Sequence, residues 1–206
     1  MSIFIKLCSR VSTAIIILVM NFSVLFGEEN INYEYKDMIK GEELAEVTII
    51  EYASFTCSHC ATFHKDVFPK LKKDFIDTGK VKFVYREVYF DAPGLWAGLL
   101  ARCTTADKYF GIVDLLYKKQ DKWSTGSSEE EILKELFSIG RQVGIPEEKI
   151  QQCMKNEKLA LNMIEAFQKN TKLDAITATP SLVINGKLYK NLSYGDLKEE
   201  LSKLLE

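Results

Sequence analysis

Neither sign of charge is in excess in this chain of 206 residues, which carries 27 Lys and Arg against 29 Asp and Glu. The formal net charge of −2 argues against a nucleic-acid-binding protein that works by its electrostatic field alone, so no nucleic-acid partner is expected. A single long apolar run excludes a polytopic membrane protein. With 47% hydrophobic residues, the chain is not intrinsically disordered. Its length fits one domain, or one domain that carries an insertion.

Cysteine is also scarce. The five cysteines are too few for a small disulfide-rich scaffold and too unevenly placed for a structural zinc module. Cys8 lies in the N-terminal segment, and the other four are Cys57, Cys60, Cys103 and Cys153. An even number of cysteines in an oxidising compartment suggests two pairs, and the sequence alone leaves their connectivity open.

Residues 1–27 differ in composition from the rest of the chain. Lys6 and Arg10 precede an apolar stretch over residues 11–26, and acidic residues begin directly after Gly27. This order predicts an export signal, which is either cleaved as a signal peptide or retained as an N-terminal anchor. A buried N-terminal helix is the alternative, and the lack of a polar face argues against it. We therefore expect a periplasmic protein, either soluble or tethered by this segment.

The first half of the exported chain is typical of a βαβ unit. Residues 28–45 are polar and mixed, and are predicted to be a flexible lead-in. Residues 47–52 and 81–88 are rich in β-branched and apolar side chains, which indicates two buried strands. The helix between them has one apolar face and is expected to kink at Pro69.

A helical segment separates this unit from a second group of strands. Residues 91–170 have helical periodicity throughout, and Ser128 and Glu131 are predicted to form a capping box in which each side chain satisfies a backbone amide. Residues 171–206 then contain a hairpin turn at Asn185-Gly186 and an amphipathic terminal helix. The sequence thus predicts an α/β domain over residues 28–90 and 171–206, with an inserted α-helical domain over residues 91–170.

The motif Cys57-Ser58-His59-Cys60 stands where the first strand gives way to a helix. A disulfide between its cysteines would close over the first helical turn. Cys57 would lie at the helix N-terminus, where unpaired amides and the helix dipole favour a thiolate, and His59 can add a charge or a hydrogen-bond donor. A lowered pKa of Cys57 stabilises the reduced state, so the disulfide becomes oxidising. Cys60 lies deeper and is expected to act as the resolving thiol.

Two other interpretations of the motif are weaker. A structural disulfide at this spacing closes too small a loop to constrain the unfolded chain much. A zinc site needs four ligands, whereas Cys57, Cys60 and His64 give three at most. His64 is expected instead on the exposed face of the helix.

The arrangement resembles the DsbA-like thiol:disulfide oxidoreductases, which have a thioredoxin fold with a helical insertion. Residues 51–60 are similar to the family signature E-F-x-S-x-x-C-P-H-C, and the resemblance covers about residues 33–205. It implies that Cys57 is the nucleophile, that Cys60 resolves, and that His59 stabilises the thiolate. Ser58 stands where the family often has proline, so the redox potential can differ.

The resemblance also assigns roles outside the motif. Glu51 matches a buried acid that can shuttle the proton of the deeper thiol, the alternative being a carboxylate that faces solvent. Thr179-Pro180 corresponds to a cis-proline loop whose exposed backbone can pair with an extended substrate, the alternative being an ordinary trans bond. Cys103 and Cys153 both fall in the insertion and are expected to form a structural disulfide, as in some relatives; two buried free thiols are the alternative.

The expected function is that of an exported oxidase, without a cofactor, that introduces disulfides into unfolded secreted proteins. The resemblance implies a DsbB-like membrane partner that reoxidises it. Thr179 is the residue that isomerase-type relatives carry before the cis-proline, so an isomerase or reductase is one alternative. Such isomerases are dimers built by a large N-terminal domain, for which residues 28–46 leave no room, so we expect a monomer. A copper-handling or other metal-binding module is the second alternative.

Overall fold

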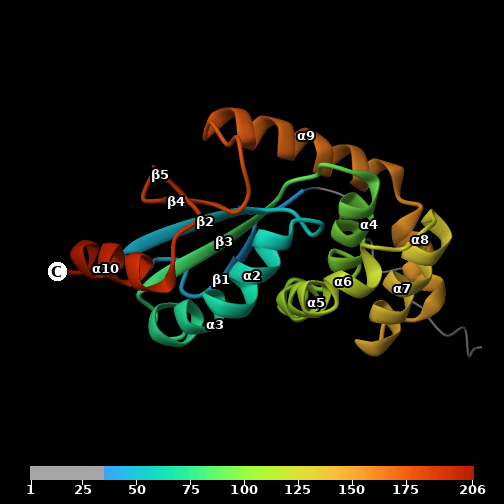
Figure 1. Cartoon of the computed structure of the whole chain (residues 1–206), viewed down its shortest axis with the longest axis horizontal. Helices are drawn as coiled ribbons and strands as arrows, with labels where there is room; N and C mark the ends of the chain where they lie inside the picture. The colour runs from blue at the N-terminus through green and yellow to red at the C-terminus, as the bar shows by residue number, and fades with distance from the viewer. Residues whose placement is uncertain (1–34) are drawn as a thin grey trace, which may run out of the picture. The chain divides into compact units, whose positions relative to one another are not determined.

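A five-stranded mixed sheet lies at the centre of the computed structural model, which describes residues 35–206 (Figure 1). The predicted export signal at residues 1–27 lies outside the described residues. The sheet has the order β1-β3-β2-β4-β5, in which only β2 and β3 run parallel. Its strands are β1 (Met38–Lys40), β2 (Val47–Ala53), β3 (Val81–Glu87), β4 (Ser181–Ile184) and β5 (Lys187–Lys190).

The predicted βαβ unit is confirmed, with β2 and β3 paired in parallel from Val47↔Val81 to Ala53↔Glu87. The connection consists of α2 (Ser58–Asp66), α3 (Phe68–Leu71) and the π-helical turn η1 (Lys72–Ile76). The interruption between α2 and α3 agrees with the kink predicted from Pro69. This proline lies in the first turn of α3, where its missing N–H breaks no helical hydrogen bond.

Strand β1 corrects the expectation that residues 28–45 form a flexible lead-in. It pairs antiparallel with β3, with Met38 opposite Tyr85. The adjacent Asp37 accepts hydrogen bonds from the Arg86 guanidinium at 2.9–3.3 Å. A three-residue edge strand is too short to show a period of two, and its stability comes from the pairing with β3.

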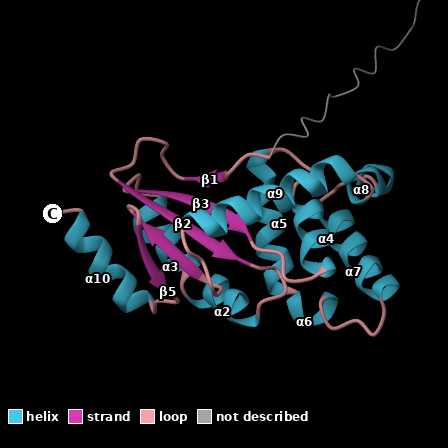
Figure 2. Cartoon of the chain, turned by 90° about the horizontal axis from the view of Figure 1, so that it is seen from above, coloured by secondary structure: helices cyan, strands magenta, loops and turns pink. Residues whose placement is uncertain are grey.

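Six helices between β3 and β4 confirm the helical insertion: α4 (Ala92–Ala101), α5 (Ala106–Lys118), α6 (Gln120–Trp123), α7 (Glu129–Gln142), α8 (Glu147–Met154) and α9 (Glu157–Leu173). Figure 2 shows α4, α7 and α8 grouped at one end of the sheet. The last helix, α10 (Tyr194–Leu204), lies at the other end and packs against α3. None of the helices in residues 35–206 is long and apolar enough to cross a membrane.

The two faces of the sheet are covered by different helices, because successive side chains of a strand point to opposite sides. On one face, Ile49 and Ala53 belong to the main core, together with residues of α2, α3 and α5. On the other face, Ile50 and Tyr52 pack with Phe167 of α9. Figure 1 shows this division, with α9 on one side of the sheet and α2 and α3 on the other.

The predicted capping box at the start of α7 is half correct. The Ser128 side chain accepts from the Glu131 backbone N–H at 3.3 Å, as expected. The Glu131 carboxylate, however, accepts from the backbone N–H and the hydroxyl of Ser127, at 2.9 and 2.7 Å. Ser127 offers two donors to one carboxylate oxygen, whereas the amide of Ser128 could offer only one.

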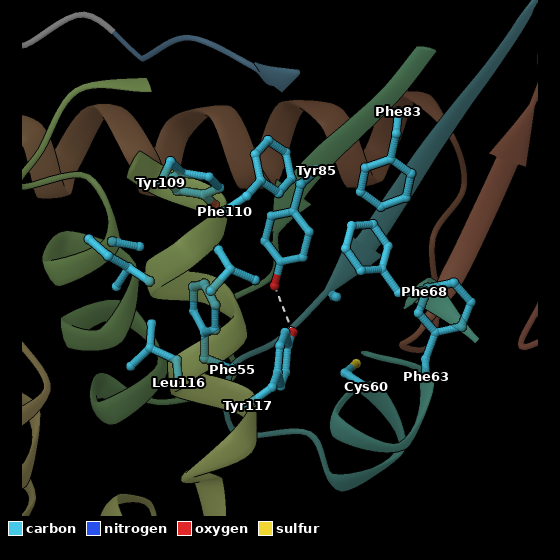
Figure 3. Packing of buried hydrophobic residues seen from close by; sticks show 14 of the residues in the cluster. Phe55, Cys60, Phe63, Phe68, Phe83, Tyr85, Tyr109, Phe110, Leu116 and Tyr117 are labelled. Carbon is cyan, nitrogen blue, oxygen red and sulfur yellow. Dashed lines mark hydrogen bonds between the residues drawn. The ribbon is translucent and has the colours of Figure 1, made fainter. Parts of the chain in front are cut away.

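A cluster of aromatic side chains joins the sheet to the insertion (Figure 3). The hydroxyl groups of Tyr85 on β3 and Tyr117 on α5 are 2.6 Å apart. Tyr117 uses its hydrogen to donate to the Ser54 carbonyl oxygen at 3.2 Å, so Tyr85 must be the donor to Tyr117. Cys60 of α2 extends into the same cluster, beside Tyr117 and Phe63.

A buried ion pair fixes α4 to the end of β3. The Arg102 guanidinium donates to both carboxylate oxygens of Glu87, at 2.7 and 2.6 Å, and the Tyr109 hydroxyl donates to the same carboxylate at 2.8 Å. The two charged side chains are 4% and 1% exposed. Such a charge is tolerated only while its partner is present, because the interior cannot solvate it.

We therefore expect Arg102→Ala to lower the free energy of unfolding by about 3 kcal/mol or more, because Glu87 would stay buried without a counter-charge. Arg141→Ala is the matched control, since it removes an ion pair with Glu147 whose side chains are about half exposed. Its expected cost is about 0.5 kcal/mol or less. Urea unfolding of both variants measures the difference, and equal losses would contradict this account.

Candidate redox site

The carboxyl ends of the parallel strands β2 and β3 place the Cys57-Ser58-His59-Cys60 motif at one edge of the sheet. Cys57 is the N-cap of α2, and its Sγ accepts from the Cys60 backbone N–H at 3.4 Å. Its extended backbone puts the sulfur over the unpaired amides of the first helical turn, as the motif predicts. Cys57 is partly exposed, whereas Cys60 is buried, and both are free thiols.

The insertion holds the loop that carries Cys57. The Gln120 side-chain amide of α6 donates to the carbonyl oxygens of Phe55 and Cys57, at 2.7 and 3.0 Å. The Thr56 hydroxyl donates to Asp91, at 2.9 Å, and Asp91 is the N-cap of α4. Sequence analysis missed Gln120 and Asp91, because their pairing with the loop leaves no local signal in the sequence.

Thr179 and Pro180 face the motif from the start of β4. The peptide bond between them is cis, not the trans alternative. The Thr179 carbonyl oxygen lies 3.5 Å from the Cys57 Sγ and accepts from the thiol when Cys57 carries its proton. Because β4 pairs with β2, this loop and the motif meet at the same edge of the sheet.

The pKa of Cys57 is lowered to about 5. The largest cause is a hydrogen bond with the Cys60 thiol, which outweighs the opposing effect of burial. Hydrogen bonds with the Thr179 side chain and with the backbone N–H groups of Cys60 and His59 lower the pKa further. These donors stabilise a thiolate at Cys57.

The pKa of Cys60 moves in the opposite direction. Burial raises it most, followed by the hydrogen bond with Cys57 and the negative charge of Glu51. The two thiols of one motif therefore differ in protonation at neutral pH, with Cys57 ionised and Cys60 protonated.

His59 contributes to this site by a different route from the expected one. Its side chain is exposed to solvent. The group of His59 that lowers the pKa of Cys57 is its backbone N–H. His59 lies in the first helical turn and therefore stabilises the Cys57 thiolate through its main-chain N–H.

Glu51 and His64 form a buried pair below the thiols. Glu51 is buried in β2, and its Oε2 lies 2.9 Å from His64 Nε2. The expectation that His64 faces solvent is wrong, because its side chain is only 2% exposed. His64 follows Cys60 by four residues, and residues at this spacing lie on the same face of a helix. This spacing could have indicated that His64 is buried together with Cys60.

Cys103 and Cys153 lie at the ends of α4 and α8, and the structure joins them as a disulfide with a Cα–Cα distance of 5.7 Å. Both residues are buried within the insertion. They are therefore separate from the thiols of the motif. Among residues 35–206, no three His, Cys, Asp or Glu side chains lie together in a group that could hold a metal ion.

Comparison with known proteins relates this site to redox proteins. Residues 34–203 match the family model described as thioredoxin. A chain named as a protein-disulfide oxidoreductase in Rickettsia prowazekii is 33% identical over 171 residues, which cover 82% of this chain and 62% of that relative. This chain thus spans about three fifths of the length of the rickettsial relatives that it matches. Disulfide bond formation protein D of Bacillus subtilis is 29% identical, over 82% of this chain and 77% of its own length.

Solved structures give the same relation. Alpha-DsbA1 of Wolbachia pipientis superposes with a TM-score of 0.76 and 27% identity, over 82% of this chain and 90% of that one. Oxidised BdbD of Bacillus subtilis has a TM-score of 0.73 and 27% identity, over 82% and 92% of the two chains. Both matches include the helices inserted into the sheet domain.

We expect alkylation of Cys57 in the reduced protein to be half-maximal near pH 5. The thiolate is the reacting species, so the labelling rate falls as pH drops through this value and is constant above it. This midpoint lies well below the usual thiol pKa of about 8.5. Iodoacetamide labelling followed by mass spectrometry measures the rate at each site. Cys60 in the Cys57→Ser variant is the control and should stay unlabelled at neutral pH. A midpoint near that of a free thiol would contradict the geometry.

Proposed function

The chain belongs to the thioredoxin family, and from this we propose that it is a DsbA-type thiol:disulfide oxidoreductase that oxidises thiol pairs in unfolded secreted proteins. The observation that carries the proposal is the contrast between the two thiols, with the pKa of Cys57 lowered to about 5 and that of Cys60 raised. A stabilised thiolate favours the reduced protein, so its disulfide is oxidising. Each pKa unit corresponds to roughly 30 mV for a two-electron couple.

The exposure of the two sulfurs gives the order of events. A substrate thiolate attacks Cys57, because Cys60 is buried. The Cys57–Cys60 bond breaks, a mixed disulfide forms between substrate and Cys57, and Cys60 leaves with the electron pair and takes up a proton. A second substrate thiolate then attacks the substrate sulfur of the mixed disulfide and displaces Cys57 as the stabilised thiolate. The substrate loses two electrons, and the protein gains them.

The loop at Thr179 is suited to position the substrate. Its carbonyl oxygen lies beside Cys57, 3.5 Å from the sulfur. An extended substrate can pair with the Thr179 backbone and so bring its cysteine in line with the Cys57–Cys60 bond. Backbone pairing of this kind is independent of the substrate's sequence, as an oxidase of many unfolded proteins requires.

Turnover and location complete the proposal. The reduced protein must return two electrons to an oxidant, for which we infer a DsbB-like membrane partner. The composition of residues 1–27 supports export to the periplasm, with the protein soluble or tethered there as a monomer. A disulfide isomerase or reductase is the competing function, which Thr179 before the cis-proline favours.

The oxidised protein is expected to restore disulfides to reduced, unfolded ribonuclease, and Cys57→Ser should abolish this reaction while the helical content is unchanged. The reduction potential of the Cys57–Cys60 couple should be less negative than the roughly −270 mV of thioredoxin. An equilibrium titration with glutathione measures it. A value near that of thioredoxin, or no ribonuclease oxidation, would reject the oxidase.

The isomerase alternative predicts a different result in a second assay, the reactivation of scrambled ribonuclease. It requires reactivation of scrambled ribonuclease and a dimer in light scattering. We expect a monomer that reactivates scrambled ribonuclease poorly. Metal analysis of protein purified without chelator separates both functions from a metal-binding module, which would retain a metal ion on the thiols.

A further inference from the structure

The buried pair of Glu51 and His64 interacts with Cys60 through the charge of Glu51. Glu51 Oε2 and His64 Nε2 are 2.9 Å apart, which requires a hydrogen between them. The two side chains are 0% and 2% exposed. Glu51 Oε1 and His64 Nδ1 are also buried and have no hydrogen-bond partner. One oxygen of the carboxyl group is thus held, and the other is free to exchange a proton.

The surroundings of His64 fix the direction of its ring. The imidazole stacks on the ring of Tyr117, with centroids 4.2 Å apart, and meets Tyr85 edge-on at 5.7 Å. Phe68 of α3 closes the pocket at 4.9 Å. These contacts fix the plane of the ring, and the hydrogen bond with Glu51 selects the orientation that brings Nε2 to Oε2.

The titratable groups that interact with the pair come from three elements: Tyr85 from β3, Cys60 from α2, and Asp114 and Tyr117 from α5. Tyr85 and Tyr117 stay protonated, because burial raises the pKa of both far above neutrality. Burial raises the pKa of Asp114, and a charge interaction with His64 opposes this effect. Glu51 acts on the Cys60 thiol through its charge.

We propose that His64 is a positioning residue that holds the Glu51 carboxyl group, so that Oε1 gives a proton to Cys60 when the active-site disulfide opens and takes it back when the disulfide re-forms. The inference rests on the proposed exchange chemistry. It adds a residue that controls the proton transfer without touching the sulfur.

A substrate thiolate forms a bond to Cys57, the Cys57–Cys60 bond breaks, and Cys60 departs with the electron pair. The proton on Glu51 Oε1 moves to the Cys60 sulfur, which leaves a carboxylate whose Oε2 accepts from the Nε2–H of His64. During reoxidation the Cys60 proton returns to Oε1, and the sulfur attacks Cys57 in the mixed disulfide with the oxidant. The Nε2–H of His64 donates to Oε2 throughout.

His64 matters because the carboxylate formed in this step is shut off from water. A buried carboxylate without a hydrogen-bond donor is strongly disfavoured. A donor such as the Nε2–H of His64 stabilises the carboxylate. Loss of the Nε2 donor therefore disfavours the carboxylate form of Glu51. Reoxidation, which needs Glu51 as a base, then slows at neutral pH.

The test measures single-turnover exchange between the oxidised protein and excess glutathione over a range of pH. Acid quenching and mass spectrometry give the rate of mixed-disulfide formation at Cys57, which is divided by the concentration of glutathione thiolate. For the wild type this normalised rate should fall with rising pH as Glu51 loses its proton. His64→Leu should move the midpoint of the fall upward by about one to two pH units.

Three variants separate positioning from a general structural effect. His64→Gln places an N–H donor near the position of Nε2 and should restore the wild-type midpoint. Glu51→Gln should remove the pH-dependent fall altogether. Tyr109→Phe deletes a buried hydroxyl bonded to Glu87, away from the pair, and should leave the midpoint unchanged. If His64→Leu does not fold, His64→Asn replaces it, because its shorter amide cannot reach Oε2.

Carbon-13 NMR of the Glu51 carboxyl group provides a readout that does not depend on exchange activity. The signal is assigned by its loss in Glu51→Gln, and its titration midpoint should rise in His64→Leu. Equal midpoints in the wild type and His64→Leu would overturn the proposal. A shift in the NMR titration without a shift in the rate profile would also overturn it, since His64 would then hold Glu51 without affecting proton transfer. If the Glu51 midpoint rises in His64→Leu but the wild-type protein does not react with glutathione at all, the result contradicts the proposed function and leaves the role of His64 intact.

Discussion

The hydrogen bond between the buried Cys60 thiol and the sulfur of Cys57 is the interaction on which the chemistry of this protein depends. It is the largest cause of the lowered pKa of Cys57, and it requires Cys60 to keep its proton. Burial provides that condition, because it raises the pKa of Cys60. One sulfur can therefore act as a stable thiolate because its neighbour is withdrawn from water. The sheet edge, the first turn of α2 and the aromatic cluster all maintain this difference in exposure.

The inserted helices do more than enlarge the domain, since they build one wall of the site. Gln120 of α6 holds the two carbonyl groups that flank Thr56, and Asp91 at the start of α4 holds the Thr56 hydroxyl. Tyr117 of α5 lies against His64. These contacts hold the loop that carries Thr56 and Cys57, although the loop is in contact with solvent. The Cys57 sulfur therefore keeps its position for different substrates.

Features that depend on local sequence could be predicted from the residues, whereas distant contacts such as the Cys103–Cys153 disulfide were expected only with the help of the family resemblance. The β-branched runs at residues 47–52 and 81–88 and the Asn185-Gly186 turn all lie in the expected elements, because their signals are short-range. Strand β1 was missed because its three residues are stabilised by β3. The burial of His64 was missed because it depends on where α5 packs against α2. Gln120 lies 63 residues from Cys57, and only the folded chain brings the two together.

The two tyrosines beside the site have one further consequence. Tyr85 donates to Tyr117, and Tyr117 donates to the carbonyl oxygen of Ser54. A carbonyl has no hydrogen to hand on, so this chain of hydroxyl groups ends there and cannot relay a proton. Tyr85 and Tyr117 thus form an aromatic wall beside Glu51 and Cys60 that does not conduct protons. These two hydroxyl groups therefore give Glu51 and Cys60 no hydrogen-bonded route for a proton through this wall.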